Sequence, residues 1–510
     1  MHHKAIKAEI RKQLKTQYPN WHCLSKKEKK AIAKKVLAEA VNNYDFKQEV
    51  TTPLDVLLGI ESQLPTASIM KLDEMGRFIE DCKNSVLFKL NRKKCHPLHI
   101  KDEELRYIDN LIDDKIINKL LSYDGYSPAM RDLYPSNFLR AELLKAVKYP
   151  EISYRKFCGD DNDYEGHKEH SPYIGMDNKQ NRAFIGLPLN RKKMFSHVQM
   201  CQFRAGLTFS QLVNLMVYIL YHIRECGILD ESSVHCVDST ELPVDRQQLL
   251  AVLKIKGKNI RIYDDIDCDC GKRRKKRDKS VYVVGYRMHT LTAINPKTGH
   301  SIPLISLLAP ANHHDSHFLS PLVRLAKAIG LDLKLITADE AYHDTDGSFF
   351  KESGVHLVKP PNSKVSLPAN VDGDTLQVML DDFCDIPMKY IGIEEQGHEF
   401  KCGVQSGQCH RSELCSKFRH IAFDDGCFQR ILYGSDVVSK ALDIRKNGER
   451  PFNLLKKREG LEQVRVRSQH GLVARTMFTT MATLLLELAG TRRTKKVKQK
   501  QIELPLAANF

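Results

Sequence analysis

The sequence contains no Cys-x-x-Cys pair, only one tryptophan and no apolar segment at its start. The spacing of the cysteines and the polar start argue against a secreted, disulfide-bonded protein. Its 14 cysteines are scattered from Cys23 to Cys427 over 510 residues. In a chain of this length such scatter is not a disulfide framework, and it indicates a reducing compartment. The first residues, Met1-His2-His3-Lys4, lack the apolar run of a signal peptide. We therefore expect a cytoplasmic protein.

The sequence also lacks a run of residues apolar enough to predict a membrane span. Its most apolar long stretch, residues 207–223, includes the polar residues Ser210, Gln211, Asn214 and His222. A stretch of this kind predicts a buried helix in a soluble protein.

The charge is strongly one-sided. Lys and Arg number 79 against 63 Asp and Glu, which gives a formal net charge of +16 and a sequence pI of about 9.1. A surplus of this size favours polyanions, with nucleic acid first and anionic membranes second. Charge alone does not indicate any chemistry.

The length suggests about three domains, at roughly 150 residues each. Residues 1–157 have helical periodicity, with a Ser-x-x-Glu capping box at Ser25–Glu28 and an amphipathic pattern over 105–120. We interpret this region as a helical domain, and the polar stretch 158–198 as a linker or long loop. Helical spacing returns from residue 199 to residue 228.

Strand patterns follow. A short apolar run at 234–237 ends in Asp238, a hairpin is predicted over 281–308, a helix over 318–329, and a second apolar run at 333–337 leads to Asp339. This order predicts a mixed α/β sheet with acidic residues at one edge. Asp315 is expected to cap the helix at 318–329.

The remaining segments complete the predicted organisation. Residues 199–354 and 435–490 form the two parts of the α/β core, and residues 355–434 form an insertion that we expect to be β-rich. Residues 491–510 form a basic tail.

Two aspartates and one glutamate are candidates for metal-dependent chemistry. Asp238 and Asp339 each follow an apolar run, where open α/β sheets place their sites, although a helix cap or a turn would also explain either one alone. Glu449, Phe452 and Lys456 fall on one face of a predicted helix, with Arg445 one turn earlier. An exposed helix bearing salt bridges is the alternative. Carboxylates are the ligands that Mg²⁺ prefers.

Several segments resemble, in order, the core of bacterial insertion-sequence transposases of the DDE class. They are Cys236-Val237-Asp238-Ser239-Thr240, Gly285-Tyr286-Arg287-Met288-His289, Asn312-His313-His314-Asp315, Thr337-Ala338-Asp339-Glu340-Ala341-Tyr342, and the spacing Arg445-x3-Glu449-x6-Lys456. The last spacing is similar to that of the branch with an insertion before the catalytic Glu.

This resemblance implies an RNase H-like catalytic core in which Asp238, Asp339 and Glu449 hold two Mg²⁺ or Mn²⁺ ions. It implies cleavage at transposon ends and transfer of the freed 3′-hydroxyl into target DNA, by a homodimer assembled on double-stranded DNA. Arg445 and Lys456 would contact that DNA. The helical region 1–157 would recognise the DNA ends, and the insertion 355–434 would clamp the substrate. A nuclease that does not join strands, or a DNA-binding protein without catalysis, remains as an alternative. Pro451 is comfortable only in the first turn of a helix, so the glutamate helix is expected to begin near Asn447 or Gly448.

Two further groups are candidates for binding. The run Lys272, Arg273, Arg274, Lys275, Lys276 and Arg277 is interpreted as a DNA backbone contact or as a solvated loop. A second group, Cys402, Cys409, His410 and Cys415, is either a zinc site in the insertion or a set of reduced cysteines in a small core.

Overall fold

The computed structural model describes most of the chain. The described residues are 1–84, 99–121, 133–159, 178–188, 196–229, 233–244, 248–274, 280–342, 344, 348–380, 386–394, 396–403, 418–458, 461 and 468–490.

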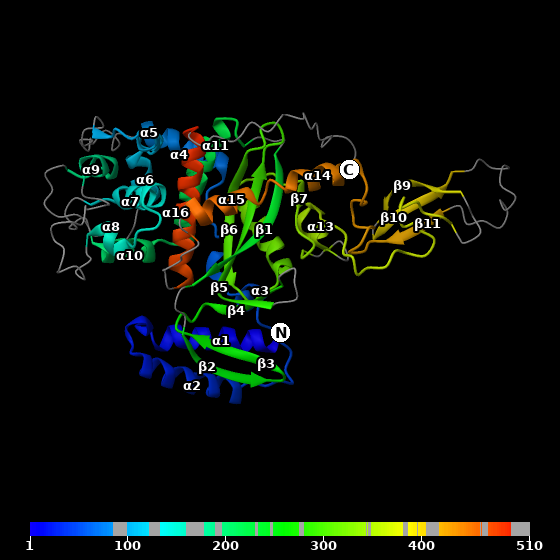
Figure 1. Ribbon diagram of the computed structural model, residues 1–510, viewed down its shortest axis with the longest axis horizontal. Helices are drawn as coiled ribbons and strands as arrows, with labels where there is room; N and C mark the ends of the chain where they lie inside the picture. The colour runs from blue at the N-terminus through cyan, green and yellow to red at the C-terminus, as the bar shows by residue number, and fades with distance from the viewer. Residues whose placement is uncertain are drawn as a thin grey trace.

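A mixed six-stranded sheet forms the centre of the molecule (Figure 1). Its strands are β1 (Val234–Pro243), β4 (Asp269–Arg274), β5 (Ser280–Ile294), β6 (Ser301–Pro310), β7 (Leu335–Thr337) and β8 (His356–Val358). β6, β5 and β1 are antiparallel neighbours, β7 and β8 continue the sheet parallel to β1, and β4 pairs with the start of β5. This is the expected RNase H-like arrangement.

Local chemistry explains the predicted hairpin of β5 and β6. Asn295 accepts hydrogen bonds at its Oδ1 from the backbone N–H groups of Lys297 and Thr298, and Gly299 has a φ of +69°. Only glycine adopts that backbone conformation without strain. β6 is buried along nearly its whole length because both faces of the sheet are covered.

Helices cover one side of the sheet and share a continuous core with it. These are α4 (Leu72–Asn84), α5 (Glu103–Leu111), α6 (Asp114–Leu120), α7 (Pro135–Lys148), α8 (Tyr154–Cys158), α9 (Lys179–Ile185), α10 (His197–Gly206), α11 (Phe209–Glu225) and α16 (Gln469–Leu488). We call them the helical block. It lies to the left of the sheet in Figure 1, and α16 contacts both α11 and β6.

Of the described helices, α16 is long and apolar enough by itself to cross a membrane, and the bent pair α10–α11 passes the same test as one unit. However, 89% of the most apolar window of α16 is buried within the protein. A helix that is apolar all round and packed in this way is a core helix. The predicted buried helix at 207–223 is confirmed as α11.

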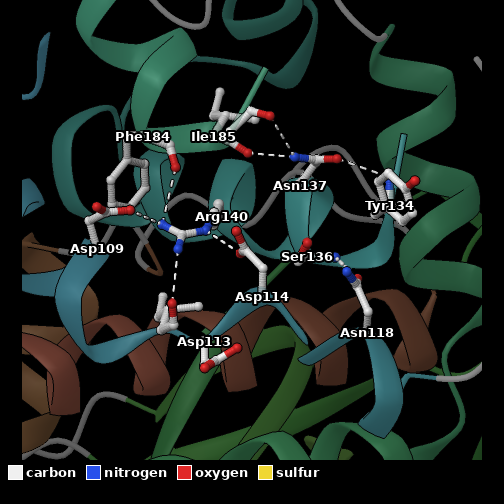
Figure 2. A network of polar contacts seen from close by, with 12 residues as sticks. Asp109, Asp113, Asp114, Asn118, Tyr134, Ser136, Asn137, Arg140, Phe184 and Ile185 are labelled. Carbon is white, nitrogen blue, oxygen red and sulfur yellow. Dashed lines mark hydrogen bonds and ion pairs between the residues drawn. The ribbon is translucent and has the colours of Figure 1, made fainter. Parts of the chain in front are cut away.

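Arg140 of α7 cross-links the helical block from inside (Figure 2). Its guanidinium donates to the carboxylates of Asp109 and Asp114 at 2.6 Å each, and to the backbone carbonyls of Ile112 and Phe184 at 3.0 and 3.2 Å. Burial lowers the pKa of Arg140, but the two carboxylates outweigh it and raise that pKa above its ordinary value. The partners join α5, α6, α7 and α9 into one unit.

The interpretation of residues 158–198 as a linker is wrong for part of that range. α9 packs into the helical block with Phe184 and Ile185 fully buried, and Asn137 donates to the carbonyl of Ile185 at 2.7 Å (Figure 2). The polar residues around a short apolar segment obscured it in the sequence.

Residues 1–157 are also not one helical domain. α1 (His2–Gln17) and α2 (Lys26–Asn42) pack on a hairpin of β2 (Leu249–Ile255) and β3 (Lys258–Tyr263), with a hydrophobic core separate from that of the helical block. We call α1, α2, β2 and β3 the N-terminal unit. It lies below the sheet in Figure 1. The short α3 (Leu54–Leu58) follows α2 in the chain.

Between β8 and the last core helices, the described residues form a three-stranded antiparallel sheet, as predicted for the insertion. Its strands are β9 (Met388–Glu394), β10 (Gly397–Cys402) and β11 (Phe418–Ala422), in the order β11–β10–β9. A small core of its own supports it. It projects to the right in Figure 1.

The remaining helices border the sheet. α12 (Leu319–Ala328) follows a 3-10 turn at Asp315–Phe318, and α13 (Ser348–Ser353) precedes β8. α14 (Asp436–Arg445) packs on β1, β7 and β8, while α15 (Arg450–Asn453) continues into a π-helical turn at Leu454–Arg458.

Candidate active site

Asp238 lies where β1 loses a neighbour. β1 and β7 pair in parallel only through His235 with Ile336 and Cys236 with Thr337. Beyond these pairs the two strands separate, and Asp238 and Asp339 follow them at the same edge. Each carboxylate accepts a hydrogen bond at its Oδ1 from the next backbone N–H, at 2.7 Å for Asp238 and 2.8 Å for Asp339. The predicted convergence of these two aspartates therefore follows from the strand order.

Glu449 reaches this edge on the turn between α14 and α15. The turn is pressed onto the sheet: a Cβ on Gly448 would lie 2.7 Å from the Sγ of Cys236, and Ser301 of β6 donates to the carbonyl of Asn447 at 2.8 Å. Cys236 is two residues before Asp238 on the same face of β1. Gly448 thus permits the close approach that brings Glu449 towards Asp238.

The predicted start of the glutamate helix is off by a few residues. Glu449 is the N-cap of α15 rather than part of it, and Pro451 occupies the first turn. After Asn453 the chain changes to π geometry. The face shared by Glu449 and Lys456 was derived from regular α-helical spacing, which this segment does not keep, so that alignment does not follow.

Asp238 lies within the electrostatic field of the other two carboxylates. Burial first, and then the charges of Asp339 and Glu449, raise the pKa of Asp238 to about 6, against the Ser239 N–H and the Arg445 guanidinium, which lower it. Asp339 and Glu449 are themselves exposed. The edge therefore combines a shielded carboxylate with two accessible ones.

Arg445, the last residue of α14, lies within this acidic group. Its Nη2 is 3.3 Å from the Oδ1 of Asp339. Arg445 was predicted to contact DNA, and here it forms an ion pair with a carboxylate of the site. It offsets part of the negative charge.

The donor set fits divalent cations in charge and type. Three carboxylate oxygen donors match the preference of Mg²⁺ and Mn²⁺, and their mutual repulsion would be relieved by a bound cation. Within the described ranges, no group of three or more His, Cys, Asp or Glu side chains is close enough to hold one ion by itself. The fit rests on chemistry and convergence.

A second layer of charge lies along β1 and β5, and its strand residues alternate with Asp238 and therefore face the other side of the sheet. Arg287 of β5 contacts Asp315 at 2.7 Å and Glu241 of β1 at 3.3 Å. Next to it, His289 is fully buried and stacks on Phe318 with 3.8 Å between ring centroids. Burial lowers the pKa of His289 to about 3, so the ring is neutral.

This layer corrects one expectation about Asp315. It does not cap α12; the His314 side chain accepts from the Ser316 N–H, and Asp315 pairs with Arg287 instead. The sequence motif around Arg287 was visible, but its pairing with Asp315 depends on the sheet.

Tyr342 completes the layer. It is buried just after Asp339, and burial together with the charges of Asp315 and Asp238 raises its pKa well above the ordinary value. We therefore expect its hydroxyl to stay protonated beside the site.

The other predicted binding residues are only partly described. Lys272 is exposed on β4 opposite Tyr282, and Lys456 is half-buried in the π turn. The backbone of Arg273 and Arg274 is the end of β4, but their side chains, and all of Lys275, Lys276 and Arg277, lie outside the described residues.

The suggested zinc site lies largely outside the described residues. Cys402 is half-buried at the end of β10, whereas Cys409, His410 and Cys415 lie outside the described residues. Nearby, the Nε2 of His398 is 2.6 Å from the carbonyl of Gln429.

A segment of the chain that contains two of these three carboxylates matches a protein family. Residues 230–377 match the family model of the transposase DDE domain. This segment of the chain is similar to a transposase DDE domain. The match spans β1 to β8 and includes Asp238 and Asp339, and it ends before Glu449. No curated protein matches the chain.

Proposed function

We propose that this protein is a DNA transposase that cleaves transposon ends and joins the freed 3′-hydroxyl to target DNA, with Asp238, Asp339 and Glu449 as its catalytic, metal-holding residues. The observation that carries the proposal is the convergence of these carboxylates, from segments about 100 residues apart, at the edge where β1 and β7 separate. The DDE transposase domain supports it.

The two divalent cations would activate the attacking oxygen and stabilise the leaving oxygen of the phosphodiester. The chain's own residues prepare the edge for them. Asp238 is shielded and has a pKa near 6, so it is ionised at neutral pH. Arg445 holds Asp339 in place and offsets the repulsion among the carboxylates.

The surrounding residues supply contacts to the substrate. Lys272 and Lys456 would bind the phosphates of double-stranded DNA near the cut. The insertion would clamp the transposon end, and two copies of the chain would act together on DNA in the cytoplasm, where the nucleoid lies. Zinc in the insertion is a separate proposal that metal analysis of the purified protein would decide.

Cleavage can be tested with the element's own flanking DNA and Mg²⁺, by mapping the cut ends. We expect Asp339→Asn to reduce cleavage by about 10³-fold or more, since a metal ligand contributes several kcal/mol and each 1.36 kcal/mol is tenfold in rate. DNA binding should remain. The matched control is Glu340→Gln, which removes the neighbouring exposed carboxylate and should leave cleavage nearly unchanged.

A second assay with a pre-cut end separates a transposase from a nuclease that does not join strands. Joining of the 3′-hydroxyl to target DNA supports the proposal. Cleavage by Asp339→Asn at the wild-type rate would exclude this site. Binding of DNA by the wild-type protein without any cleavage would instead support a DNA-binding protein without catalysis.

A further inference from the structure

Two positively charged segments of the chain are brought together by the fold. Residues 1–44 contain eleven Lys and Arg against three Asp and Glu, and residues 249–263 contain four against none. Together they have a net charge of +12. The segments are more than 200 residues apart in sequence, but α1 and α2 pack on the hairpin of β2 and β3.

Part of this charge is neutralised on the side that faces the sheet. Lys7 pairs with Asp269, and Lys15 and Lys29 pair with Asp267 and Asp264 at 2.8 Å each. These aspartates follow β3 directly. These three aspartates therefore attach the N-terminal unit to the core by ion pairs, and they neutralise the lysines of the unit that face the sheet.

The outward lysines keep their charge. Lys27, Lys30 and Lys34 lie along one stripe of α2 at three- and four-residue spacing, and Lys254, Lys256 and Arg261 lie on the hairpin. We call these six residues the basic hairpin surface. No carboxylate of the described residues forms an ion pair with any of them. On α2, Glu28 is engaged in the capping box and Glu39 is 3.9 Å from Lys35, on another stripe.

A groove lies between α2 and β2 and is bordered by Lys34 of this surface. It has a volume of about 460 Å³ and is lined by Lys34, Leu37, Ala38 and residues 249–253. Val252, about half exposed, sits on the outer face of β2 beside Lys254. The surface is thus a ridged, positively charged face rather than an enclosed pocket, which suits an extended polyanion and not a small anion.

The position of this surface relative to the carboxylates favours DNA among polyanions. β1 runs from Asp238 to Pro243, five residues or about 17 Å, and then leads into the N-terminal unit. At about 3.4 Å per base pair, a duplex bound at the acidic edge reaches the end of β1, where the chain enters the N-terminal unit, in about five base pairs.

We propose that the basic hairpin surface binds the phosphate backbone of double-stranded DNA, without reading its sequence, beside the cleavage edge. This rests on the proposed function for its substrate, but not on catalysis. Lysines on a helix stripe and a short hairpin act as point charges towards phosphates, and such contacts position a duplex rather than specify it.

The test compares two triple variants of the full chain. Lys30→Gln/Lys34→Gln/Lys254→Gln removes three charges from the surface. Lys71→Gln/Lys179→Gln/Lys351→Gln removes three exposed lysines elsewhere, so both variants have the same net charge. Both carry Asp339→Asn, so that binding is measured without cleavage and stays interpretable even if the cleavage proposal fails. Equal thermal midpoints would establish that both fold.

Binding of two duplexes of unrelated sequence is measured by fluorescence anisotropy between 50 and 200 mM salt. For the surface variant we expect the slope of log K against log salt to fall in magnitude by about 3, equally for both duplexes, and for the control by much less. Equal slopes in the two variants would overturn the proposal. Loss of binding to one of the two duplexes only would also overturn it. A change in self-association, or in binding to anionic vesicles, with DNA binding intact would do the same.

Discussion

Two charged clusters in this protein are built on opposite plans. In the helical block, Arg140 is a single buried cation with two carboxylates and two carbonyls around it, so its charge and its hydrogen bonds are satisfied. At the sheet edge, Arg445 pairs with Asp339 and its charge acts on Asp238, while Asp339 and Glu449 add negative charge beside Asp238. The closed cluster needs nothing further from outside the chain. The open one has negative charge to spare, and that is what suits it to bind cations.

Breaking the closed cluster should have the largest effect on folding. Arg140→Met leaves Asp109 and Asp114 without their partner inside the helical block, and removing one side of a buried ion pair costs about 3–5 kcal/mol. We expect urea unfolding, followed by circular dichroism, to show a loss of that size. Arg224→Met, which removes a largely exposed ion pair with Asp73, is the control and should change stability by less than about 1 kcal/mol. Equal losses would mean that the network is not a structural centre.

Removing a charge from the open cluster at the sheet edge should stabilise the protein at neutral pH, whereas removing Arg140 destabilises it. Because the folded pKa of Asp238 is raised above its ordinary value, the folded state binds more protons than the unfolded state between about pH 4 and 6. Stability from this group is therefore highest at low pH and is lost as pH rises through about 6. The loss is at most about 3 kcal/mol, at 1.36 kcal/mol per pKa unit.

Asp238→Asn should remove this pH dependence and raise the thermal midpoint at pH 7. Adding Mn²⁺ should raise the midpoint of the wild-type protein and not that of the variant, because a cation that binds only the folded state stabilises it. A variant with the same pH profile and the same Mn²⁺ response as the wild type would contradict the idea that excess negative charge at Asp238 prepares this edge for cations.

The smallest effect should come from the turn that connects α14 to the site. Gly448→Ala places a methyl group against Cys236 and must displace Glu449, at a stability cost of about 1–3 kcal/mol. We expect cleavage to fall about tenfold, with DNA binding kept. Cys236→Ala in the same chain should restore part of the activity. No recovery would show that crowding at Cys236 is not the cause.

The sequence predicts the sheet better than it predicts what surrounds it. Apolar runs ending in Asp238 and Asp339 are local signals, and the turn around Gly299 fixes the β5–β6 hairpin. The role of Asp315 was predicted wrongly because a cap and a cross-strand ion pair look alike without the position of Arg287. The placement of Glu449 depends on Gly448 meeting Cys236, a contact across more than 200 residues that no local pattern contains.

The same reason explains why the N-terminal unit was not predicted. The apolar stripes of α1 and α2 are clear in the sequence, but their partners Ile260 and Ile262 belong to a hairpin inserted between the first two strands of the core. Helical periodicity gives the buried face and not the element that covers it. In the same way, α9 is too short to stand out from its polar surroundings.

This long-range packing has a consequence for synthesis. When α2 leaves the ribosome, the residues that complete its core are still more than 200 positions from being made. At about 5–20 residues per second, roughly ten to forty seconds pass before the hairpin arrives. During that interval the apolar stripes of α1 and α2 lack their hairpin partner. The N-terminal helices therefore cannot complete their core until the middle of the chain has been synthesised. The nascent protein is most prone to aggregation before its sheet is complete.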